Sequence, residues 1–71
     1  MLGEQEAVVG EVRPFDIHGI EHVDVTLLYA DGSIESARLG SESVPPDLVS
    51  GQRILVVKAM NVVVEIRRGS G

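Results

Sequence analysis

The 71-residue chain contains no cysteine and no tryptophan, and only one phenylalanine and one tyrosine. The lack of cysteine excludes a disulfide framework, a thiolate-bound zinc and a thiol nucleophile, and it agrees with a cytoplasmic location. The longest apolar run has the four residues 54–57, so we expect no membrane-spanning segment. The acidic start at residues 1–6 lacks the positive charge of a secretory signal peptide.

A chain of this length holds one domain and buries a smaller share of its surface than a larger protein. Its apolar content of 44% and its mean hydropathy of +0.18 are high for so small a domain. We therefore expect part of the apolar surface to be shared with a partner. The predicted organisation is a flexible N-terminus at 1–6, a single β-barrel domain at 7–68 and a flexible tail at 69–71.

β-Branched residues dominate what the chain does contain, with 12 valines and 5 isoleucines against 4 alanines. Such side chains pack well on pleated sheets and lose rotamer freedom in helices. Eight glycines and three prolines supply turns. The composition predicts an all-β domain, with strands at 7–15, 21–29, 33–39, 52–58 and 62–67.

The sequence also predicts bulges, turns and strand ends. Gly10 predicts a bulge or a close backbone approach, and Pro14 predicts a strand end or an edge. Residues 16–20 are expected to form a loop, and Asp31-Gly32 is expected to form a type I′ hairpin turn. The apolar positions of the third strand change face after Ile34, which predicts a bulge or a bend.

Prolines 45 and 46 exclude a central strand between the third and fourth predicted strands. Residues 46–49 fit one 3₁₀ or α turn, with Leu48 directed to the core and Gly51 as its C-terminal cap. Five strands with one helical turn between strands 3 and 4 predict a small OB-like barrel. An SH3-like barrel is the alternative, although that fold usually has its 3₁₀ turn before the last strand.

Residues 44–66 resemble a known module. The pattern Asp47-Leu48-x-x-Gly51-x-x-Ile54-x-Val56, followed by 59–65, is similar to the interdomain OB module of proteasome-activating ATPases and to the C-terminal OB barrel of NfeD-type proteins. The resemblance implies strand and turn positions and carries over no functional residue. In the ATPase family the module assembles into rings, but this chain shows neither the flanking coiled coil nor the ATPase domain.

Charge is divided unevenly, with a net charge of −7 in residues 1–35 and +2 in residues 36–71. The total of −5 repels nucleic acid at long range, and the two aromatic residues offer few stacking platforms. Nucleic-acid binding therefore stays an alternative function, through a basic patch on strands 4 and 5 formed by Arg53, Lys58, Arg67 and Arg68.

The segment 18–22 reads His-x-x-E-His, the pattern of an inverted zinc-protease motif. That chemistry needs both histidines one helical turn apart, whereas in a strand His18 and His22 lie about 13 Å apart. A weak metal or small-ligand site at these two histidines remains a further alternative. No serine elbow, phosphate loop or cofactor motif is present, so we expect no enzyme and no cofactor.

Strands 4 and 5 carry apolar residues on both faces, whereas a small barrel has only one inner face. By alternation, the predicted outward apolar residues are Leu28, Leu55, Val57 and Val63. The sequence thus predicts a non-catalytic protein–protein interaction or oligomerisation module, which binds either a protein partner or a second copy of itself.

Overall fold

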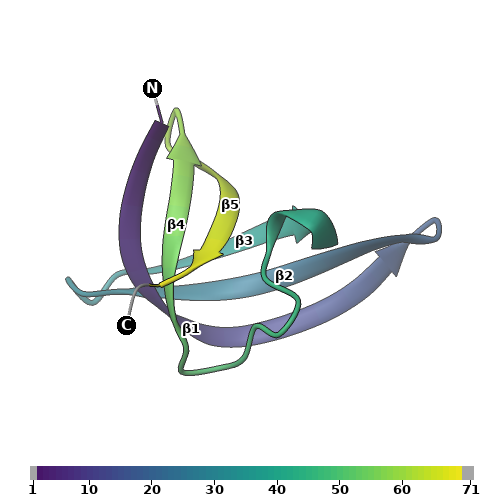
Figure 1. The fold of residues 1–71 in the computed structure, drawn as a ribbon, viewed down its shortest axis with the longest axis horizontal. Coiled ribbons are helices and arrows are strands. Elements are labelled where there is room, and N and C mark those ends of the chain that lie inside the picture. The colour runs from purple at the N-terminus through teal and green to yellow at the C-terminus, as the bar shows by residue number, and fades with distance from the viewer. Residues whose placement is uncertain (1, 70–71) are drawn as a thin grey trace.

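Five antiparallel strands form one sheet in the computed structural model, which describes residues 2–69. The strands are β1 (Leu2–Ile17), β2 (Ile20–Tyr29), β3 (Ile34–Gly40), β4 (Arg53–Ala59) and β5 (Val62–Arg68). Their order in the sheet is β3-β2-β1-β4-β5, and the outer strands β3 and β5 approach each other (Figure 1). The sheet thus curls into a small, partly open OB-like barrel, as predicted.

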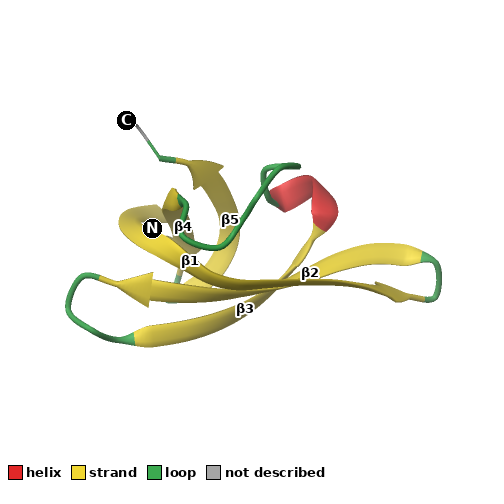
Figure 2. Ribbon diagram, turned by 90° about the horizontal axis from the view of Figure 1, so that it is seen from below, coloured by secondary structure: helices red, strands yellow, loops and turns green. Residues whose placement is uncertain are grey.

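A single 3₁₀ turn, η1 (Ser41–Ser43), lies between β3 and β4 and on one side of the β1–β2–β3 part of the sheet (Figure 2). This place agrees with the OB-like prediction and not with the SH3-like alternative. The helical turn lies at 41–43 and not at 46–49 as predicted, where residues 46–47 form a turn without helix. Each proline keeps the residue before it out of the helical region, so η1 ends before Pro45. Val44 is accordingly extended, with φ −132° and ψ 154°.

The segment after η1 follows the prediction in one respect, since Leu48 packs against the core. Gly51 has a φ of +89°, but no helix ends there for it to cap. Among residues 2–69, no helix is long and apolar enough to cross a membrane.

The first strand is much longer than predicted, because both of its edges find partners along different parts of its length. Residues 2–8 pair with β4, from Leu2 opposite Ala59 to Val8 opposite Arg53. The prediction of a flexible N-terminus at 1–6 is therefore wrong for residues 2–6. The predicted tail lies outside the described residues except for Gly69, whose N–H donates to the Arg53 carbonyl at 3.1 Å.

A bulge interrupts β1 at the predicted glycine. The register with β2 shifts by one residue between Val9 and Val12, and a Cβ on Gly10 would lie 3.3 Å from the Thr26 methyl group. Pro14 lies beyond the end of the β4 pairing, where β2 is the only neighbour of β1. The missing N–H of Pro14 thus belongs to an edge, as predicted.

The first two of the three hairpin turns differ from the predicted ones. β1 and β2 pair up to Ile17 and Ile20, so the expected loop 16–20 is a two-residue turn in which His18 and Gly19 both have positive φ. The turn at Asp31-Gly32 exists but is not type I′, because only Gly32 has a positive φ there. The Gly32 N–H donates to the Tyr29 carbonyl, which is typical of a three-residue loop ending in a glycine bulge.

The third strand is regular. β2 and β3 pair without a register shift from His22 opposite Gly40 to Leu28 opposite Ile34. The bulge or bend predicted in this strand is therefore wrong. Ile34 is an exposed apolar residue on the outer face, whereas Ala37 and Leu39 face inward.

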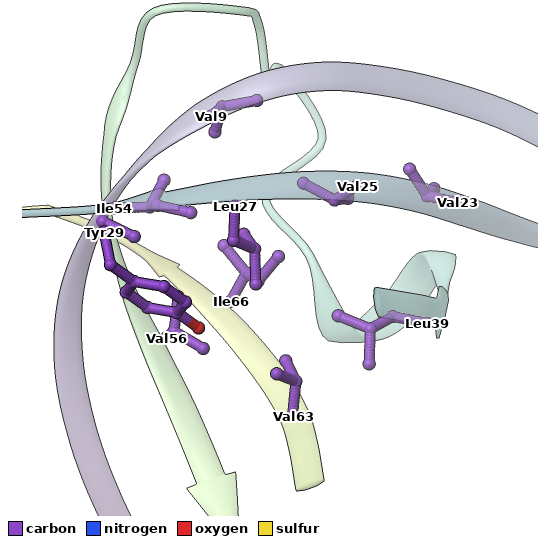
Figure 3. Close-up of a cluster of buried hydrophobic side chains, with 11 residues drawn as sticks. Val9, Val23, Val25, Leu27, Tyr29, Leu39, Ile54, Val56, Val63 and Ile66 are labelled. Carbon is purple, nitrogen blue, oxygen red and sulfur yellow. The ribbon is translucent and has the colours of Figure 1, made fainter. Parts of the chain in front are cut away.

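The inner faces of all five strands supply one core (Figure 3). Alternation along β2 directs every second side chain inward from Val23 to Tyr29, as predicted from the sequence. The side chains with less than 2% exposure are Leu27, Ile54, Val9, Val25 and Val56. The barrel interior is thus filled by aliphatic side chains.

Candidate functional site

The four predicted interface residues do not form one exposed surface. Val63 is only 9% exposed and belongs to the core, so its predicted outward orientation is wrong. The reason is a bulge: the pairing of β4 with β5 shifts between Val57 and Lys58, and Val64 is the extra residue on β5. The bulge directs Val63 inward and leaves Val64 exposed.

Val57 does lie outside the core cluster, yet it is only 5% exposed. It pairs with Glu4 on one side and with Glu65 on the other. Arg67 joins these two carboxylates, with ion pairs of 3.5 Å to Glu4 and 3.2 Å to Glu65. A charged layer therefore covers the predicted apolar strip, and Leu55 in the next register position is half-buried.

Exposed apolar side chains instead gather at the end of the barrel where the chain begins. Leu2 pairs with Ala59, and Ala59 pairs with Val62, so that three strands contribute to one row. Leu2 is 70% and Val62 is 61% exposed, and Met60 in the adjoining turn is 86% exposed. Figure 1 shows the start of β1 beside this turn. We call Leu2, Met60, Val62 and Val64 the apolar end.

The turn of the apolar end has an unusual residue in it. Met60 and Asn61 form the two-residue connection between β4 and β5, with φ of 51° and 67°. Two-residue turns with positive φ at both positions favour asparagine, aspartate and glycine. A long apolar side chain is uncommon in this conformation. The chain thus presents Met60 to solvent at a conformational cost.

A polar cluster on the inner side of the barrel links Lys58, which precedes the row of the apolar end, with Tyr29 and Glu35. The Tyr29 hydroxyl donates to Glu35 Oε1 at 2.6 Å, and Lys58 Nζ lies 3.0 Å from the same oxygen and 5.4 Å from the Tyr29 ring centroid. These hydrogen bonds, that of Tyr29 first, lower the pKa of Glu35. Burial and the hydrogen bond to Glu35 raise the pKa of Tyr29. The cluster joins β2, β3 and β4.

The four basic residues of the nucleic-acid alternative are dispersed. Lys58 is directed inward to Glu35, Arg67 pairs with Glu4 and Glu65, and Arg68 Nη2 pairs with Asp47 at 2.7 Å. Among residues 2–69, Arg53 is the one member of this set without an ion pair. Carboxylates therefore neutralise most of the predicted basic patch.

The two histidines lie on different parts of the arm, the hairpin of residues 12–25. His18 is in the turn, and His22 stacks on Phe15 with ring centroids 5.7 Å apart. Arg38 lies 4.5 Å from the Phe15 ring centroid and pairs with Asp24 at 2.9 Å, which lowers the pKa of Asp24. Within residues 2–69, no group of three histidine, aspartate or glutamate side chains is placed to hold a metal ion.

Sequence reasoning missed Leu2, Met60 and Val62 for identifiable reasons. Leu2 lies in the segment expected to be flexible, and Met60 lies in the connection between the last two predicted strands. Strict alternation with Val63 outward places Val62 inward. The positive φ at Met60 follows from the two-residue connection, which a hairpin template between the two valine-rich runs would have indicated. Comparisons with family models, with curated proteins and with solved structures give no match.

Proposed function

We propose that this barrel is a non-catalytic interaction module that associates with a second copy of itself through the apolar end. The observation that carries the proposal is the concentration of exposed Leu2, Met60 and Val62 in one register row and its turn. Their burial in a dimer removes apolar surface from water, which is the main driving force of protein association.

Charge at the rim of the apolar end supports a second copy as the occupant. Glu4 and Glu65 lie in the next register row, and Arg67 lies beside them. Both signs of charge therefore border the same apolar surface. An isologous interface brings the same patch of both copies together, so a two-fold axis through the apolar end allows Arg67 of each copy to face the carboxylates of the other.

Substitution of Met60 tests the proposal. Met60→Glu places a charge in the centre of the apolar end and is expected to shift the protein from dimer to monomer in light scattering over a concentration series. Val49→Glu is the matched control, since Val49 is 59% exposed in the loop before β4 and outside the apolar end. Equal masses for wild type and Met60→Glu at every concentration would contradict the proposal.

A further inference from the structure

The arm bears a second hollow surface, separate from the apolar end. One hollow of about 490 Å³ lies between the arm and the segment 44–48, and a neighbouring one of about 310 Å³ lies toward the tip of the arm. The two share the lining residues Pro14, Glu21, Val23 and Ser41, so they form one continuous groove. We call it the arm groove.

The floor of the arm groove is apolar. Val12 and Val23 come from the two strands of the arm, and Val44 and Leu48 come from the segment that follows η1. Val12, Val44 and Leu48 are partly buried side chains packed against the core. An occupant with aliphatic side chains therefore extends the hydrophobic core outward.

Acidic side chains form the rim of the arm groove. Asp16 and Glu21 lie directly opposite each other on β1 and β2, and both are exposed. No arginine or lysine of residues 2–69 pairs with either carboxylate. Like charges directly opposite each other destabilise a hairpin, so this pair costs the free arm stability. A cation from outside the chain removes that repulsion.

Pro14 determines how an occupant binds. It lies on the part of β1 that has no neighbour on its second edge, and proline has no N–H to offer there. A further strand added at this edge would lack a hydrogen bond at Pro14, in the middle of the edge. Recognition is left to side chains in the hollow and to charge at its rim.

We propose that the arm groove binds a peptide segment of a partner protein that carries lysine or arginine next to aliphatic side chains. The aliphatic side chains contact the floor near Val12, Val23 and Leu48, and the cationic groups lie between Asp16 and Glu21. Charge complementarity selects the occupant and sets the rate of encounter. This inference is independent of the apolar end, which lies at the other end of β1.

The test uses short synthetic peptides and the ¹⁵N-labelled chain. A peptide that alternates lysine and valine is expected to shift the amide resonances of residues 12–13, 15–16, 21–23, 41–44 and 47–48, more weakly as salt rises. A peptide that alternates glutamate and valine is expected to shift none of them. Equal shifts with both peptides, or none with either, would overturn the proposal.

Two charge reversals complete the experiment. Glu21→Lys places opposite charges across the arm, so the arm stays paired while the affinity for the basic peptide falls about tenfold. Glu6→Lys is the matched control, because Glu6 is exposed, lies outside the groove and changes the net charge equally. The same loss in both variants overturns the proposal. Shifts of the groove amides with protein concentration alone, without peptide, also overturn it, since the occupant is then a second copy.

Discussion

Met60 combines two local costs at one position. Its φ of 51° is a left-handed conformation, which costs an L-residue other than glycine or asparagine about 1–2 kcal/mol. Its side chain is 86% exposed, so in the isolated chain it contributes almost no hydrophobic stabilisation. His18 in the other two-residue turn has nearly the same φ of 52°, but its ring is polar. Met60 is thus the residue whose side chain has most to gain from a partner.

Met60→Asn separates stability from association. Asparagine tolerates the left-handed conformation, so the free energy of unfolding of the monomer is expected to rise by about 1 kcal/mol. Loss of the apolar side chain is expected to weaken association at the same time. Urea unfolding at low protein concentration and light scattering at high concentration measure the two effects.

His18→Asn is the control for this substitution. It makes the same backbone change in the turn of the arm and is expected to raise stability without any effect on association. If Met60→Asn destabilises the chain, or if both variants change the measured mass equally, the interpretation of Met60 is incorrect.

At the scale of elements, the one extra residue in β5 determines which of its side chains face the core and which face solvent. The bulge at Val64 lets Val63 and Ile66 both face the core, although their spacing of three does not fit a regular strand. Val62 then lies on the outer face in the row with Ala59 and Leu2. Because of the bulge, β5 contributes Val63 and Ile66 to the core and Val62 to the apolar end.

A pair of substitutions tests this register. Val63→Glu puts a carboxylate into the core and is expected to cost at least about 3 kcal/mol, enough to unfold much of so small a domain. Val62→Glu, one residue away, is expected to leave the fold intact and to reduce association. Circular dichroism during thermal unfolding distinguishes the two, and the reverse order of stabilities would exclude the bulge.

Alternation along the strands predicted the inner faces of β2 and β4 and the existence of five strands. Alternation failed where a bulge interrupts the period of two, and where only pairing with another strand makes a segment a strand. Alternation alone places Val63 outward. The bulge that turns it inward depends on the pairing of β5 with β4, which the sequence of β5 by itself does not reveal. Residues 2–6 look like a polar terminus by themselves, and only their pairing with β4 makes them a strand. The surface that carries the proposed function depends on both features.

At the scale of the whole molecule, the barrel is closed by side chains more than by backbone. β3 and β5 are the two ends of the hydrogen-bonded sheet. Across this opening, Lys58 on β4 reaches Glu35 on β3, and Tyr29 on β2 donates to the same carboxylate. The cluster joins strands that do not all pair with one another, so its integrity affects the stability of the entire fold.

Glu35 contributes to the pH dependence of stability. Because its pKa in the folded chain lies below the ordinary value of 4.5, the ionised cluster stabilises the fold above that value. This contribution is lost as the pH falls through the lowered pKa. We expect Glu35→Gln to destabilise the chain at neutral pH and to reduce the loss of stability on acidification.

Unfolding in urea at neutral and acidic pH checks this expectation. Glu6→Gln is the control, since Glu6 is exposed and forms no ion pair among the described residues. The same acid dependence in wild type and Glu35→Gln would show that the cluster does not contribute.

The central claim is that two copies associate through the apolar end, and a dilution series of ¹⁵N-labelled protein followed by NMR tests it most directly. The account predicts that the amides of residues 2–4 and 58–64 shift or broaden as the concentration rises, while those of residues 34–40 do not. Spectra that stay unchanged over the series, or changes centred on β3, would contradict it.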